Sequence, residues 1–292
     1  MPYSIQFLLM LVASITAMAV RCAAQETLNL WPGEQPPGFV ANNQEETISE
    51  RGRIDNVKTP TITVFPPTDG VNTGLALIVC PGGSYTHLGW NTGVVDTARY
   101  FNQLGITVIG LKYRVRPLYK ITPTDRSLPL QDAKRAVQLV RSHAAEWGID
   151  PHKIGVMGIS AGSNLTMTLA DEYDTGDAAS ADPIARFSNR PDFVVAGALW
   201  HWKQTESPFK FDADTPPAFL VHATNDPVAP VELAYAVRDQ LKSVGVPVHL
   251  DLYDHGRHGV AQLTARRLQQ KDPTTEWPEH LLAWLEKNGI TD

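Results

Sequence analysis

The stretch "IGVMGISAGSNLTMTLA", residues 154–170, places a serine between glycines at a point where a strand changes into a helix. The apolar residues before the serine have the length and bulk of a buried parallel strand, and those after it suit a buried helix. Its neighbours Gly158, Ala161 and Gly162 are small, as a sharp turn that exposes a serine hydroxyl requires. The pattern predicts Ser160 as a nucleophile, and a serine in an ordinary turn is the alternative interpretation.

The segments on either side alternate between strand-like and helix-like patterns. Buried strands are predicted at residues 61–65, 75–80, 106–113, 153–158, 193–200, 217–223 and 247–253. Helices are predicted at residues 93–105, within 125–150, and at 230–245 and 277–289. This alternation predicts an α/β fold in which helices cover both faces of one mostly parallel sheet. A ligand site is then expected beyond the carboxyl ends of the strands.

The chain begins with an apolar segment. The uncharged run "FLLMLVASITAMAV", residues 7–20, is short for a membrane span, and a small-x-small pattern follows at residues 22–24. We therefore expect a signal peptide over residues 1–24 and one mature α/β domain over residues 25–292, secreted or periplasmic and not held in a membrane. Arg21 beside the cleavage site, and the absence of Lys or Arg before the apolar run, leave an uncleaved N-terminal anchor open.

The composition is that of an ordinary globular chain. Of the 292 residues, 43% are hydrophobic and 19% are charged, which is enough for a large core. The formal net charge is −6 and there is no basic run, so we expect small-molecule or oligosaccharide partners and no nucleic acid. After signal cleavage Cys80 would be the one cysteine, which excludes a disulfide framework. The oligomeric state is left open.

A nucleophilic serine needs a histidine to take its proton and a carboxylate to orient that histidine. Asp226 lies just past the carboxyl end of the strand predicted at 217–223, where such an acid belongs. An Asx-turn or helix cap before Pro227 is the alternative interpretation of this residue. Asp212 and Asp214 precede the same strand and would emerge at the opposite end of the sheet.

The loop "YDHGRHGV", residues 253–260, follows the last predicted strand and holds two histidines. His258 is the predicted base, because Gly259 flanks it and its later position reaches farther back toward the nucleophile. His255 is the alternative. The two histidines could instead bind a metal ion, but no third ligand follows at a sensible spacing, so no metal is expected.

Backbone N–H groups must also face the negative charge that develops on a substrate oxygen. Ala161, directly after the serine, is expected to supply one of them. Others are expected from the loop "PGGSY", residues 81–85, whose glycines let the main chain approach a substrate closely. An ordinary Pro-Gly turn is the alternative interpretation of this loop.

Three tryptophans lie near predicted strand ends, namely Trp90, Trp200 and Trp202. Indole rings can stack on sugars, so we predict these residues to bind substrate. Packing in the core or at its rim is the alternative role.

Four motifs occur in a fixed order: "PGGSY", the stretch from Leu128 to Gly162, "NDPVAP" and "HGRHGV". With them the chain resembles α/β-hydrolases of the esterase/lipase group, and most of all secreted bacterial acetyl-xylan-esterase-like proteins, some of which are labelled xylanase B-like. The resemblance implies an α/β-hydrolase domain without a metal or organic cofactor. It implies Ser160 as nucleophile, Asp226 as acid and His258 as base.

The resemblance also implies Gly83, Ser84 and Ala161 as donors to the oxyanion. Related esterases often have His-Gly-Gly-Gly where this chain has the residues from Pro81 to Ser84. The backbone N–H groups remain, but the resemblance does not fix the conformation at Ser84, where the sequence departs from the family pattern.

Together these residues predict a serine carboxylesterase that removes acetyl or other acyl groups from plant polysaccharide fragments through an acyl-enzyme. A general short-acyl carboxylesterase, a serine peptidase of the same fold and a non-catalytic binding protein are the alternatives. Glycosidic cleavage finds no support in a paired-carboxylate motif.

Overall fold

The computed structural model describes residues 25–41, 43–68, 71–116, 118–119, 121–122, 125–202 and 206–291. The predicted signal peptide, residues 1–24, lies outside the described residues. Within the described ranges, no helix has both the length and the apolar character needed to cross a membrane.

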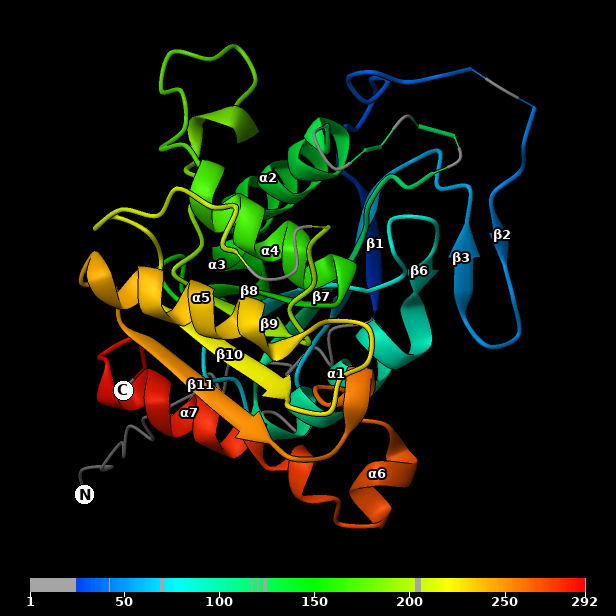
Figure 1. Cartoon of the computed structure of the whole chain (residues 1–292). Coiled ribbons are helices and arrows are strands. Elements are labelled where there is room, and N and C mark those ends of the chain that lie inside the picture. Colours follow the sequence, from blue (N-terminus) through cyan, green and yellow to red (C-terminus); the bar gives the residue numbers. More distant parts are fainter. Residues whose placement is uncertain are drawn as a thin grey trace, which may run out of the picture.

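One large sheet forms the centre of the described chain (Figure 1). Its strands, in spatial order, are β1 (Glu26–Asn29), β4 (Thr61–Phe65), β7 (Thr107–Lys112), β5 (Ala76–Cys80), β8 (Ile154–Ile159), β9 (Phe193–Gly197), β10 (Ala218–Ala223) and β11 (Val248–Tyr253). The strands from β7 to β11 run parallel, whereas β1 and β4 pair antiparallel at one edge. The prediction of a mostly parallel sheet is therefore confirmed.

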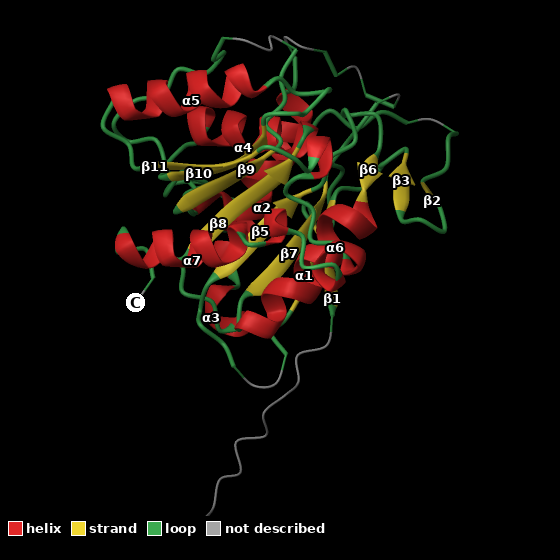
Figure 2. Cartoon of the chain, turned by 60° about the horizontal axis from the view of Figure 1, so that its bottom comes forward, coloured by secondary structure: helices red, strands yellow, loops and turns green. Residues whose placement is uncertain are grey.

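Helices cover both faces of this sheet, as predicted. They are α1 (Asp96–Phe101), α2 (Ser127–Ser142), α3 (Ala144–Trp147), α4 (Ala161–Glu172), α5 (Val231–Ser243), α6 (Ala265–Gln269) and α7 (Trp277–Lys287). Figure 2 shows the sheet between α4 and α5 on one side and α1 and α7 on the other. Successive strand residues serve opposite faces: in β5, Ile78 packs into the core under α2 and α4, and Val79 into the core under α1 and α7. The sheet thus separates two apolar cores.

A small second sheet was not predicted. Its antiparallel strands are β2 (Thr47–Ile48), β3 (Arg53–Asp55) and β6 (Leu88–Gly89). It holds the chain that follows the "PGGSY" loop, because the Gly89 N–H donates to the Gly82 carbonyl at 2.9 Å and the Trp90 N–H donates to the Gly52 carbonyl at 2.9 Å. The small sheet therefore fixes a loop next to Ser160.

One predicted helix differs in detail, and one strand was not predicted. The helix predicted at 93–105 begins with a π-helical turn at Asn91–Val95, continues as α1 and ends in a 3-10 turn before Gly105, which adopts a φ of +78°. The strand that was not predicted is β1, whose side chains are largely exposed and which, within the described residues, pairs with β4 alone. An edge strand with one neighbour needs no apolar run, and so no such pattern marks it.

A buried ion pair ties β7 to α2. Arg114 follows β7, and its guanidinium lies 2.7 Å from the Asp132 carboxylate, with both side chains fully buried. The Arg114 backbone N–H also donates to Asp132 at 2.8 Å. We expect Asp132→Ala to lower the free energy of unfolding by about 3 kcal/mol, because it leaves a buried guanidinium unpaired.

Urea unfolding measures this loss. The control is Asp239→Ala at the surface, where the carboxylate side chain is 62% exposed beside Arg238. That variant is expected to change the free energy of unfolding by less than about 1 kcal/mol. Equal losses in the two variants would contradict the importance assigned to the buried pair.

Candidate active site

The predicted nucleophile lies on a tight turn between β8 and α4. Ser160 has a φ of 59° and a ψ of −121°, a backbone conformation that costs energy for any residue other than glycine. The turn leaves no room for larger neighbours. A Cβ atom on Gly162 would lie 1.9 Å from the Cys80 carbonyl oxygen, and one on Gly158 would lie 2.0 Å from the Gly162 carbonyl oxygen. The small residues around the serine are therefore required by space.

Three predicted side chains meet at this turn. His258 Nε2 lies 2.8 Å from Ser160 Oγ, and His258 Nδ1 lies 2.8 Å from Asp226 Oδ2. The three residues follow β8, β10 and β11, so they gather at the carboxyl edge of the sheet. The Asp226 side chain is fully buried, whereas 26% of the His258 side chain is exposed. The arrangement aligns a hydroxyl, an imidazole and a carboxylate for proton transfer from the serine.

The Asp226 carboxylate is held by several donors. Its Oδ1 accepts hydrogen bonds from the backbone N–H groups of Val228 at 2.8 Å and Ala229 at 3.0 Å. Asp226 therefore also forms the Asx-turn that was the alternative interpretation of this residue. Desolvation raises the pKa of Asp226, but the hydrogen bonds from His258 and the two N–H groups outweigh it and hold the pKa below its usual range. The ionised carboxylate fixes the proton on His258 Nδ1 and leaves Nε2 as the acceptor for the serine proton.

Comparison with known proteins relates this geometry to esterases. The profile of the family described as BD-FAE matches residues 64–196, and that of the prolyl oligopeptidase family matches residues 196–287. The solved structure of an acetyl ester-xyloside bifunctional hydrolase from Caldicellulosiruptor lactoaceticus is 28% identical, with a TM-score of 0.74 over 91% of this chain and 97% of that one. By its fold the chain is an α/β-hydrolase, and it is similar to esterases.

Two curated relatives of this hydrolase have names that concern xylan. It is 27% identical over 230 residues to endo-1,4-beta-xylanase B of Butyrivibrio fibrisolvens, and 24% identical over 203 residues to acetylxylan esterase of Xylanibacter ruminicola. These matches cover 69% and 64% of the hydrolase but only 34% and 41% of the relatives. The hydrolase therefore spans less than half the length of either relative.

The "PGGSY" loop of the hydrolase carries the predicted oxyanion donors. Gly83 has a φ of 139° and Ser84 a φ of 54°, and both line the cavity at Ser160. Within the described residues, neither of their backbone N–H groups has an acceptor. Ala161 begins α4, where the N–H groups of the first turn have no partner in the helix. The hydrolase thus offers free donors on both sides of the serine, and their role toward an oxyanion stays a prediction.

A cavity of about 310 Å³ opens at Ser160 and His258. The other side chains that line it are Ser84, His87, Thr92, Ile159, Val228 and Gln262. His87 and Gln262 were not singled out in the sequence, because a single polar residue makes no pattern. Their positions a few residues after the "PGGSY" loop and after His258 are the one signal that could have pointed to them.

The three tryptophans predicted to bind substrate are not among the described residues that line this cavity. Trp90 lies over Gly110 of β7, where a Cβ atom would come within 2.7 Å of its ring. Trp202 stacks on Tyr85 with 5.7 Å between ring centroids, and Trp200 packs on Trp202 at 4.7 Å. These contacts give the three residues a packing role, and a contact with substrate stays a prediction.

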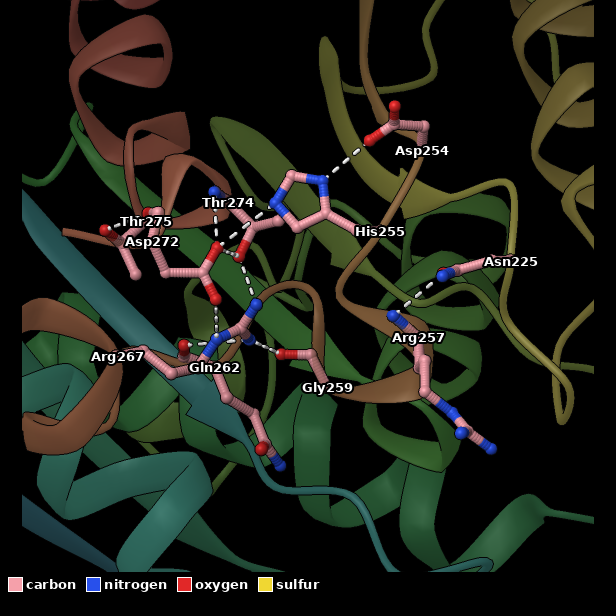
Figure 3. A network of polar contacts seen from close by, with 10 residues as sticks. All are labelled: Asn225, Asp254, His255, Arg257, Gly259, Gln262, Arg267, Asp272, Thr274 and Thr275. Atoms are coloured by element: carbon pink, nitrogen blue, oxygen red, sulfur yellow. Dashed lines mark hydrogen bonds and ion pairs between the residues drawn. The ribbon is translucent and has the colours of Figure 1, made fainter. Parts of the chain in front are cut away.

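The alternative base, His255, has partners other than the serine. His255 contacts Asp254 at 2.7 Å and Asp272 at 3.4 Å (Figure 3). Gly256 adopts a φ of 98° between the two histidines and turns the chain, so that His255 and His258 have different partners. The two histidines are not part of a metal-binding cluster, and no group of three His, Cys, Asp or Glu suited to a metal ion occurs in the described part of the hydrolase.

An arginine braces the turn that follows His258 (Figure 3). The Arg267 guanidinium donates to the Gly259 carbonyl, to the Asp272 carboxylate at 3.0 Å and to the Thr274 hydroxyl. Asp272 also accepts the Thr274 backbone N–H at 3.0 Å. This network, which the sequence did not reveal, ties the His258 turn of the hydrolase to the segment before α7.

The brace predicts an acid-sensitive contribution to stability. Desolvation raises the pKa of Asp272, but hydrogen bonds from Thr274 and Arg267 outweigh it and lower the pKa to about 2. Because the folded pKa lies below the ordinary value of 3.8, the contribution is present above that value and is lost as the pH falls through about 2. We expect Asp272→Asn to lower the free energy of unfolding by about 1 kcal/mol at neutral pH, and the difference from the native hydrolase to shrink in acid.

Urea unfolding at a series of pH values from neutral to acid measures this difference. A difference that stayed constant over the series would contradict the assignment.

Proposed function

We propose that this α/β-hydrolase is a serine carboxylesterase that works through an acyl-enzyme. The observation that carries the proposal is the hydrogen-bonded series from Ser160 through His258 to Asp226, with 2.8 Å at each step. A serine in such a series is activated as a nucleophile without a metal or an organic cofactor.

The proposed reaction follows from these contacts. His258 Nε2 takes the proton of the Ser160 hydroxyl while Ser160 Oγ attacks the ester carbonyl carbon. The backbone N–H groups of Gly83, Ser84 and Ala161 would donate to the oxyanion. His258 then gives its proton to the departing alcohol, and the acyl group stays on Ser160. A water molecule, deprotonated by His258, attacks the acyl-enzyme; the bond to Ser160 Oγ breaks, His258 returns the proton to that oxygen, and the acid leaves.

As substrate we propose acetyl or other short acyl esters on plant polysaccharide fragments. The names of the acetylxylan esterase and of the acetyl ester-xyloside hydrolase support this class, and so does a cavity of about 310 Å³, which has room for a small acyl group and one sugar unit. A secreted or periplasmic location, expected from the apolar segment at residues 7–20, completes the proposal.

A peptidase is the second candidate, because residues 196–287, which include Asp226 and His258, match the profile of the prolyl oligopeptidase family. The test is to offer the protein acetylated xylan, p-nitrophenyl acetate and a proline-containing peptide p-nitroanilide, and to measure the released acetate, p-nitrophenol and p-nitroaniline. Acetate release from xylan and from the small ester is the expected result.

Release from the small ester alone would favour a general short-acyl carboxylesterase. Cleavage of the peptide alone would favour the peptidase. Failure on all three substrates, together with no labelling of Ser160 by a fluorophosphonate, would favour a binding protein and overturn the proposal.

A further inference from the structure

Several polar groups of the cavity have no task in the proposed reaction. Thr92 and Gln262 line the cavity at Ser160, and neither of their side chains has a hydrogen-bond partner within the described residues. The apolar side chains of the cavity are those of Ile159 and Val228. Leaving polar groups unpaired against an apolar ligand costs free energy, so this lining suits a ligand that carries hydroxyl groups.

Gln262 is held in place by its backbone. Its N–H donates to the Gly259 carbonyl at 2.9 Å, and its carbonyl accepts from Arg267 at 3.4 Å. The neighbouring residues Ala261 and Leu263 are buried in the core under α7. Figure 3 shows the Gln262 carboxamide turned away from the network of Arg267 and Asp272. A braced turn therefore presents a free amide, which can both donate and accept, to the cavity.

His87 offers an acceptor in the same cavity. The Thr86 hydroxyl donates its proton to the Gly83 carbonyl at 2.9 Å. His87 Nδ1 lies 2.9 Å from the oxygen of the same hydroxyl, so Nδ1 must carry a proton and donate it to that oxygen. Burial, and then the Arg53 guanidinium, hold the pKa of His87 below its usual range, so the ring is neutral at pH 7. A neutral ring protonated on Nδ1 has Nε2 as an acceptor for a hydroxyl.

The position of Gln262 decides which part of the ester it meets. In acyl transfer the histidine gives its proton to the departing alcohol, so the alcohol portion lies next to His258. Gln262 comes from the same turn as His258 and borders the same cavity. We therefore expect the free amide to face the alcohol portion of a bound ester and not the acyl portion.

We propose that Gln262, together with His87, binds hydroxyl groups of the alcohol portion and makes the hydrolase selective for esters of polyhydroxy alcohols such as sugars. This inference rests on the proposed esterase function. It assigns the substrate specificity of the esterase to Gln262 and His87, and not to the three tryptophans.

The test compares two acetates with six-membered rings, methyl xyloside monoacetate and cyclohexyl acetate; the xyloside carries hydroxyl groups, a ring oxygen and a methoxy group that cyclohexyl acetate lacks. In Gln262→Met, which keeps the length of the side chain, we expect the ratio of kcat/KM for the xyloside to that for cyclohexyl acetate to fall about 10-fold, mainly through KM. Gln262→Glu, which keeps acceptor oxygens, is expected to retain more of this ratio. Gln270→Met, at an exposed glutamine outside the cavity, is the matched control and is expected to keep the native ratio.

A ratio that stays within about twofold of the native one in Gln262→Met would overturn the inference. The melting temperatures of the variants separate misfolding from lost recognition, because within the described residues the Gln262 amide has no hydrogen-bond partner for the substitution to remove. If the native protein hydrolyses cyclohexyl acetate but not the xyloside, the specificity inference fails and the esterase proposal stands. If it hydrolyses neither of these nor p-nitrophenyl acetate, the esterase proposal itself fails.

Discussion

Ser160→Ala is expected to lower kcat for p-nitrophenyl acetate by at least about 10,000-fold, because the variant has no hydroxyl to form the acyl-enzyme. The remaining rate would come from the backbone donors and from binding alone. Steady-state kinetics at high protein concentration measures the loss. Ser243→Ala on α5 is the matched control: its hydroxyl donates to the Gln240 carbonyl on the surface, and the variant is expected to keep the native rate.

A second readout keeps this prediction independent of folding. The native hydrolase should gain the mass of one fluorophosphonate adduct at Ser160, and Ser160→Ala should gain none. Circular dichroism should show the same secondary structure in both. A variant that stays folded and hydrolyses the ester at the native rate would show that another residue is the nucleophile.

Asp226→Asn is expected to lower kcat by about 10,000-fold at neutral pH. The amide oxygen can still accept from Val228 and Ala229, so the loop keeps its shape. A neutral amide cannot stabilise the imidazolium that forms during attack, and its NH₂ group favours the wrong tautomer of His258. Asp254→Asn is the control, because that carboxylate is 94% exposed and pairs with His255.

The pattern of losses distinguishes the two histidines. If Asp254→Asn lost as much activity as Asp226→Asn, the result would favour His255 as the base and contradict the assignment of His258. Near-native kcat in Asp254→Asn, with unchanged melting temperatures in both variants, is the expected result.

The central strands could be predicted because each is buried on both faces. All six residues of β8 are buried, so the chain there is a plain apolar run. Strands β2 and β3 are short, and both residues of β2 are exposed, so nothing in their composition sets them apart from loops. Their pairing depends on contacts made only after the chain has folded.

The residues of the site also differ in how far the sequence could predict them. Ser160, Asp226 and His258 each follow a predictable strand, and the carboxyl ends of parallel strands share one edge of the sheet. The brace at Arg267 was not predictable, because its acceptor at Gly259 is a backbone carbonyl and carries no sequence signal. The same holds for Gln262, whose free amide becomes visible only when its neighbours are placed.

The position of β11 at the end of the sheet has a consequence for durability. This strand pairs with β10 on one side and, within the described chain, has no strand on the other. Fraying of such an edge breaks one ladder of hydrogen bonds, so it costs less free energy than melting the central strands. His258 lies in the loop that leaves this strand, so detachment of the strand is expected to move the imidazole away from Ser160. The proposed catalytic activity is thus expected to be lost while both apolar cores stay intact.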